Sequence, residues 1–118
     1  MSIDKVIEIL DKHSEVMESY VLLREIKLFL NVDHEHFHPE IRIKIYESSA
    51  LRVPYHFSVS HHVKTPTQAG PYMPSKTWAE SEEEAIRQAI STTTSYIKSA
   101  IAAGHEPSES WLIPDEDF

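Results

Sequence analysis

The sequence Ile41-Arg42-Ile43-Lys44-Ile45-Tyr46 alternates between isoleucine and a larger polar or aromatic residue. Successive side chains of a β-strand point to opposite faces of a sheet, so this alternation predicts a strand with one buried face. A similar alternation precedes it in residues 26–32 and follows it in residues 55–63. The connections are short, and one of them is an expected turn at residues 48–54. An antiparallel meander is therefore the expected topology.

Helical spacing flanks these three strands on both sides. Apolar residues between positions 3 and 20 recur at intervals of three and four, which predicts an N-terminal helix. Ser81 and Glu84 form a capping box, and apolar residues then keep the helical period up to Gly104. A second helix is therefore expected over residues 82–103. A short fourth strand is expected near residues 76–78, on an edge of the sheet because prolines precede it.

This order of elements predicts an α+β fold. We expect a two-layer sandwich in which an antiparallel meander of three to four strands has the N- and C-terminal helices packed on one face. The chain divides into a single α+β domain, residues 1–104, and an acidic C-terminal tail, residues 105–118. The tail contains Trp111-Leu112-Ile113. These side chains are costly to leave in water, so the tail is expected to dock on the domain or on a partner.

Length and composition exclude several classes of protein. The chain has 118 residues, no cysteine and only two glycines. It therefore lacks the ligands of a zinc ribbon or an iron–sulfur cluster, and it cannot form the Gly-rich loop that cradles a nucleotide phosphate. No apolar run is long enough to cross a membrane, and the N-terminus lacks the pattern of a signal peptide. The expected location is the cytoplasm.

The formal net charge of −8 is distributed unevenly. Residues 1–23 carry −3 and residues 65–118 carry −6, whereas residues 24–64 carry +1. An acidic chain repels phosphate backbones, so nucleic acid is not an expected partner. The order of helices and strands resembles that of double-stranded-RNA-binding domains. The start of the last helix, however, has four carboxylates within residues 80–84, where those domains present basic residues. The resemblance is confined to topology.

Six of the eight histidines fall between residues 34 and 62. If the first strand continues past Val32, alternate histidines lie on one face at its end. In a meander that end is shared with the end of the third strand. The predicted metal site, for zinc or a similar divalent ion, consists of His34, His36, His38, His61 and His62. In the alternative interpretation, residues 33–39 are a polar loop whose histidines point into solvent.

The function itself is not determined by these patterns. No serine lies in a strand-turn-helix elbow with flanking glycines, so a non-enzymatic module is favoured. One sheet face is expected to be mixed and partly aromatic, and such a face commonly pairs with a second copy. The expected function is a homodimer or partner-binding module, and the alternative is a metal-binding protein or metal-dependent enzyme. The candidate partner-binding residues are Phe29, Tyr46, Tyr72 and Trp111.

Overall fold

The computed structural model describes residues 1–48 and 54–118. Most of the expected turn at residues 48–54 lies outside the described residues. The elements in chain order are α1 (Ile3–Lys12), β1 (Tyr20–Phe29), β2 (Glu40–Ser48), β3 (Tyr55–Val59), β4 (His61–Val63), β5 (Trp78–Ala79), α2 (Glu82–Ala102), the 3-10 turn η1 (Glu109–Trp111) and β6 (Leu112–Pro114).

Four strands form the main sheet in the order β1-β2-β3-β5, and each pairs antiparallel with its neighbour. Ile43 of β2 lies opposite Ile26 of β1 and Val59 of β3, so the isoleucine face predicted from alternation continues across three strands. The expected antiparallel α+β meander is confirmed. The fourth strand is the short edge strand β5, which forms two residues later than the sequence indicates.

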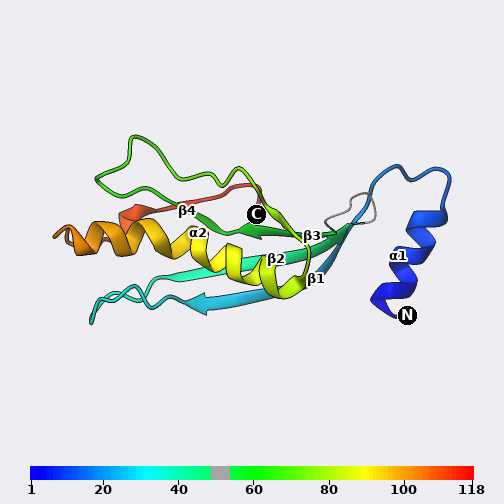
Figure 1. The fold of residues 1–118 in the computed structure, drawn as a ribbon, viewed down its shortest axis with the longest axis horizontal. Coiled ribbons are helices and arrows are strands. Elements are labelled where there is room, and N and C mark those ends of the chain that lie inside the picture. Colours follow the sequence, from blue (N-terminus) through cyan, green and yellow to red (C-terminus); the bar gives the residue numbers. More distant parts are fainter. Residues whose placement is uncertain (49–53) are drawn as a thin grey trace.

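The helix α2 covers the isoleucine face (Figure 1). Ile41, Ile43 and Ile45 are fully buried beneath it, and α2 contributes small residues and Ile97 to the same core. The N–H of Glu84 donates to Oγ of Ser81 at 3.1 Å, so the predicted cap is confirmed. No helix in the described part of the chain is both long and apolar enough to cross a membrane.

The tail returns to the body as a strand. Its segment β6 pairs antiparallel with β4, which continues the line of β3 (Figure 1). Trp111 is only 5% exposed, and Leu112 is also buried, so both belong to the core. The two sheets are therefore joined through the long β3–β4 segment, which is interrupted at Ser60.

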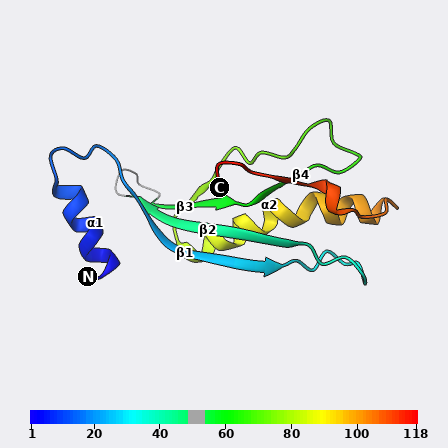
Figure 2. The same ribbon diagram turned by 180° about the vertical axis from the view of Figure 1, so that it is seen from behind.

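The N-terminal helix forms but is shorter than its apolar spacing indicates. It ends at Lys12, and β1 already begins at Tyr20. None of its residues is buried, and Figures 1 and 2 show it beyond the end of the sheet, not beside α2. A β-bulge between Leu22 and Arg24 breaks the alternation of β1. Residues 13–19, which the apolar spacing also assigns to the helix, form turns and irregular structure.

Candidate functional site

The structure places His34, His36 and His38 in the connection between β1 and β2, beyond the end of β1. Asp33 has a positive φ of 62°, so the chain turns before the first histidine and the strand does not continue. The rings of His34 and His36 are 6.3 Å apart. The Nε2 atom of His38 instead lies 3.1 Å from the carbonyl oxygen of Glu35.

His61 and His62 both lie on β4, and each has its own partner. The Nδ1 atom of His61 is 2.8 Å from Oγ of Ser60, whereas Nε2 of His62 is 2.9 Å from Oδ2 of Asp115. Burial lowers the pKa of His61 below its ordinary value, and the positive charge of Arg42 lowers it further.

The structure does not gather the five histidines of the predicted metal site into one group of ligands. Within residues 1–48 and 54–118, no group of three or more histidine, aspartate or glutamate side chains is arranged to hold an ion. The turn at Asp33 and the separate partners of His61 and His62 explain this result. The polar-loop interpretation describes His36 and His38 correctly, because both are exposed.

Ser60 is the residue at which the long β3–β4 segment changes partners. Its N–H donates to the carbonyl of Arg42 on β2 at 2.8 Å, while its own carbonyl accepts the N–H of Asp115 at 2.9 Å. Its hydroxyl oxygen also accepts the N–H of Arg42 at 2.7 Å. One edge of this segment therefore pairs with β2 before Ser60 and with β6 after it.

A cavity of about 280 Å³ lies beside β3 and β4, between the segment that precedes β5 and the residue that follows β6. Apolar side chains, two hydroxyl groups and the His62–Asp115 pair line it. The lining residues are Phe57, Ser58, Val59, His62, Met73, Pro74, Thr77 and Asp115. The hydrogen bond from His62 lowers the pKa of Asp115, and the bond from the backbone N–H of Asp117 lowers it further. Asp115 is therefore ionised at neutral pH.

The sheet face opposite α2, here called the outer face, has no helix over it in Figure 2. Register pairs place one residue from each strand in line across this face. This cross-strand row consists of Leu22, Tyr46, His56 and Trp78. Tyr20 packs edge-on against His56 with ring centroids 5.2 Å apart. Burial lowers the pKa of His56, so its neutral form is favoured in this apolar setting.

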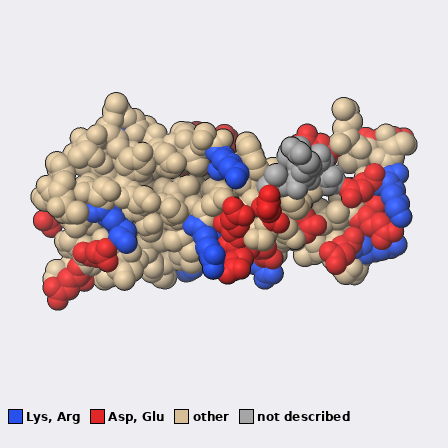
Figure 3. Space-filling model, in the orientation of Figure 1, with Lys and Arg blue, Asp and Glu red and all other residues tan. Residues whose placement is uncertain are grey.

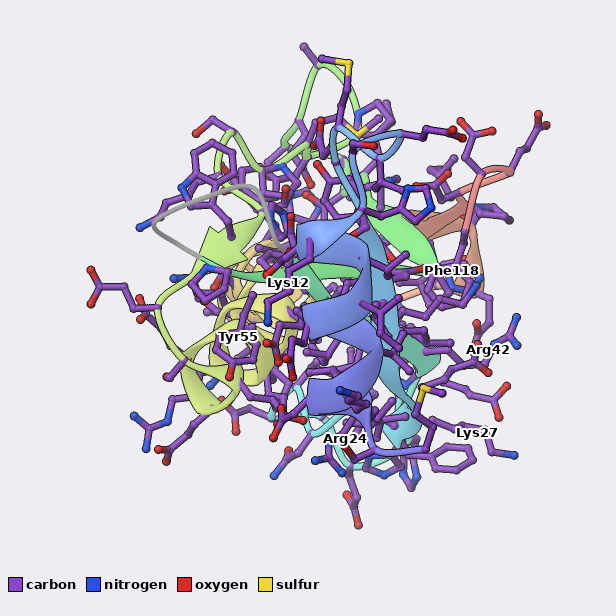
Figure 4. The ribbon with its side chains drawn as sticks, turned by 90° about the vertical axis from the view of Figure 1, so that its right-hand side faces the viewer. Lys12, Arg24, Lys27, Arg42, Tyr55 and Phe118 are labelled. Carbon is purple, nitrogen blue, oxygen red and sulfur yellow. The ribbon has the colours of Figure 1, made fainter. Side chains whose placement is uncertain are left out.

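The other half of the outer face is charged and partly covered by the tail. Lys44 Nζ lies 4.2 Å from the ring centroid of Phe118, and the Arg42 guanidinium carbon lies 5.3 Å from it. Both cations also approach the carboxylate of Glu25. Figure 4 shows Phe118, Arg42 and Lys27 along one side of the molecule. Phe118 therefore adds an aromatic ring to the charged half of the outer face.

The four candidate partner-binding residues have different surroundings. Phe29 is 67% exposed on the outer face, and Tyr46 belongs to the cross-strand row. Tyr72 packs against Tyr96 with ring centroids 4.9 Å apart, and Trp111 is a core residue. Only Phe29 and Tyr46 therefore lie on one common surface.

Sequence reasoning missed Leu22, Trp78, Asp115 and Phe118 as candidate site residues. The β-bulge hides the outward orientation of Leu22, and the pairing that puts Trp78 in the row is made by a strand of only two residues. Asp115 and Phe118 reach their positions through β6, more than 50 residues along the chain from His62. No local pattern could have assigned them.

Comparisons with protein-family models, curated proteins and solved structures find no match for this chain.

Proposed function

We propose that this protein is a non-enzymatic binding module that pairs with a second copy of itself through the outer face. The observation that carries the proposal is the cross-strand row, which spans all four strands on a face that no helix covers. Leu22 is 47% exposed and Trp78 is 38% exposed. Large apolar side chains gathered on one exposed face are typical of protein–protein interaction sites.

The distribution of charge favours a second copy as the partner. Two chains of net charge −8 repel each other, and the repulsion is smallest where their least acidic surfaces meet. Figure 3 shows acidic side chains gathered on the α2 side, where α2 begins, and also on α1. The outer face instead carries Lys27, Arg42 and Lys44 beside Glu25 and Glu40.

A two-fold interface requires a surface that is complementary to itself. The outer face meets this requirement, because it contains both an apolar row and neighbouring charges of both signs. Each copy can therefore bring carboxylates opposite the cations of the other while the two rows pack together. We expect both copies to contribute the same residues.

The face is a better candidate than the free edge of β1. This edge strand is ten residues long, and unpaired edges can recruit another strand. However, β1 contains a β-bulge, and the consecutive charged residues Arg24 and Glu25 follow it, with Lys27 two positions further on. Bulges and charged side chains are the features that protect edge strands from pairing.

The test is the mass of the protein in solution, measured by sedimentation equilibrium over a range of concentrations. The wild-type chain is expected to be a dimer, and the variant carrying Leu22→Lys and Trp78→Lys is expected to be a monomer. Met17→Lys is the matched control, because Met17 is 98% exposed and lies outside the sheet. Circular dichroism establishes that each variant is folded.

Two outcomes would contradict the proposal. A wild-type chain that stays monomeric up to about 1 mM has no self-association strong enough to matter. A folded double variant that remains dimeric to the same extent as Met17→Lys would place the interface elsewhere. Leu22→Lys alone provides the same test if the double variant does not fold.

A further inference from the structure

The segment from Tyr72 to Thr77, here called the strap, runs along the edge of the β3–β4 segment that faces away from β2, next to the pairing of β3 with β5. At one end, the N–H of Phe57 donates to the carbonyl of Thr77 at 2.9 Å. At the other end, the N–H of Tyr72 donates to the carbonyl of Val63 at 2.8 Å. Met73 and Pro74, between these two bonds, line the 280 Å³ cavity. The strap is therefore fixed at both ends and leaves a cavity beneath its middle.

The backbone of Val59 lies at the centre of this edge. In an antiparallel strand, neighbouring residues direct their N–H and carbonyl groups to opposite edges. Ser58 and Ser60 pair with β2, so Val59 directs both backbone groups toward the strap side. The cavity wall at this point therefore includes the backbone edge of Val59, which carries a hydrogen-bond donor and an acceptor.

A carboxylate that retains hydrogen-bonding capacity lies at one side of the cavity. Oδ2 of Asp115 lies 2.9 Å from Nε2 of His62, and Oδ1 accepts the backbone N–H of Asp117 at 2.9 Å. Because Asp115 is ionised, the imidazole must donate in this pair. A carboxylate offers about four lone-pair positions, and two of them are used here. The Asp115 side chain is 28% exposed, so a ligand can reach it.

The charge of the lining residues indicates which class of ligand the cavity can bind. The lining includes the Asp115 carboxylate and neither lysine nor arginine. Phe57, Val59, Met73 and Pro74 supply the apolar part of the wall. An anionic ligand would meet a fixed negative charge, whereas an ammonium group would form a charge-assisted hydrogen bond with the carboxylate.

We propose that this cavity binds a small organic ammonium ion, a primary amine with an apolar body. The ammonium group binds the carboxylate of Asp115, and the apolar body lies against Phe57, Val59 and Met73. The cavity volume of about 280 Å³ is just below the range of about 300–1,000 Å³ seen for ligand pockets, so the ligand is a small one. The site is independent of the outer face, because the cross-strand row contributes none of its lining residues.

The experiment compares three probes of similar shape and different charge, namely phenethylamine, 2-phenylethanol and 3-phenylpropanoate. Each is titrated into the full ¹⁵N-labelled chain at pH 7 while the amide chemical shifts are followed. The amine is expected to shift the amides of residues 57–59, 73, 75–77 and 115. The alcohol is expected to bind about tenfold more weakly, and the carboxylate is expected not to bind.

Asp115→Asn removes the charge but keeps an oxygen that can accept from His62. This variant is expected to bind phenethylamine about tenfold more weakly than the wild type does. Glu116→Gln is the matched control, because Glu116 is the adjacent carboxylate and is absent from the lining. It should bind the amine as the wild type does. Met73→Ala, at an exposed position of the strap, should weaken amine binding several-fold without unfolding the chain.

Three results would overturn the proposal. In the first, phenethylamine shifts no amide in the cavity at millimolar concentration. In the second, the amine and the alcohol bind equally well. In the third, Glu116→Gln weakens binding as much as Asp115→Asn does, which would show attraction to the acidic tail in general. If Asp115→Asn alters the amide spectrum of β6, the comparison of the three probes and Met73→Ala decide the outcome.

Discussion

The Nε2–H of His62 donates a hydrogen bond of 2.9 Å to Oδ2 of Asp115, and so joins β4 to the residue that follows β6. The side chain of His62 is only 12% exposed, so this bond lies largely out of water. The N–H of Asp115 also donates to the carbonyl of Ser60. Asp115 is therefore attached to the body through both its side chain and its backbone, which fixes the end of β6 beside the cavity.

Replacing His62 is expected to loosen the tail. His62→Ala removes the donor from Asp115, and the free energy of unfolding should fall by about 1 kcal/mol, because Asp115 remains partly hydrated. Amide hydrogen exchange at residues 112, 113 and 115 should become faster. Asp117→Asn is the control, since it removes a neighbouring charge but keeps the backbone N–H that Asp115 accepts.

Denaturant unfolding and hydrogen exchange provide both measurements. A double-mutant cycle that combines His62→Ala with Asp115→Asn should give a coupling free energy of about 0.5–1 kcal/mol. Additive effects of the two substitutions would show that the bond does not stabilise the tail.

The two helix caps are expected to differ in their effect on stability, although their chemistry is the same. Oγ of Ser81 accepts the N–H of Glu84 at 3.1 Å, and Oγ of Ser2 accepts the N–H of Lys5 at 3.2 Å. Ser81→Ala should lower the free energy of unfolding by about 1 kcal/mol, because α2 packs on the sheet. Ser2→Ala should leave the main thermal transition unchanged, because α1 has no buried residue.

Thermal melts of the two variants under identical conditions test this contrast. If Ser2→Ala and Ser81→Ala lower the melting temperature equally, α1 unfolds together with the sheet and packs on a surface, such as that of a second copy. An unchanged midpoint for Ser81→Ala would mean that packing alone determines where α2 begins.

Elements with a short-range signal could be predicted from the sequence. The cap of α2 depends on residues three positions apart, and the buried face of β2 depends on a period of two. The hydroxyl of Thr93 donates to the carbonyl of Ala89 within one helical turn. In each case the interaction lies within a few residues, so the local pattern contains the information.

The candidate site could not be predicted in the same way. The positive φ of Asp33 redirects the chain before the histidines, and alternation alone does not indicate such a turn. The cavity depends on the pairing of Asp115 with His62 and on the path of the strap, which are both long-range contacts. The cross-strand row depends on register, and the β-bulge in β1 sets the position of Leu22.

Truncating the buried side chain of Trp111 is expected to lower the free energy of unfolding far more than truncating its exposed neighbour Ile113. Trp111 is buried in the core, whereas Ile113 is 38% exposed on the same short segment. Trp111→Ala should lower the free energy of unfolding by about 3–5 kcal/mol, which is a large part of the stability of a small domain. Ile113→Ala should cost less than about 1 kcal/mol. Urea unfolding followed by circular dichroism measures both, and similar losses would contradict the structure of the tail.

Stability is expected to decrease as the pH falls below about 6.5. Burial is the largest cause of a lowered pKa at both His56 and His61. For a base with a lowered pKa in the folded state, the unfolded chain binds more protons between the two pKa values. The contribution of the two neutral histidines to stability is therefore complete above the unfolded-state pKa of about 6.5. It is lost progressively as the pH falls toward their pKa values in the folded state. Within the described residues, Nε2 of His56 is buried without a hydrogen-bond partner, so protonating it adds a buried donor.

Thermal melts between pH 5 and pH 7.5 test this dependence. The variant with His56→Phe and His61→Gln should lose less stability than the wild type over this interval, because neither replacement takes up a proton. His36→Gln is the control, since His36 lies exposed in the β1–β2 connection, and its melting temperature should follow the wild-type curve. The carboxylate of Asp115 affects stability at lower pH. Its pKa is lowered in the folded state, so the ionised carboxylate stabilises the fold above about pH 3.9, and this stabilisation is lost as the pH falls below that value. Parallel curves for the wild type and the double variant would mean that other groups cause the loss above pH 5.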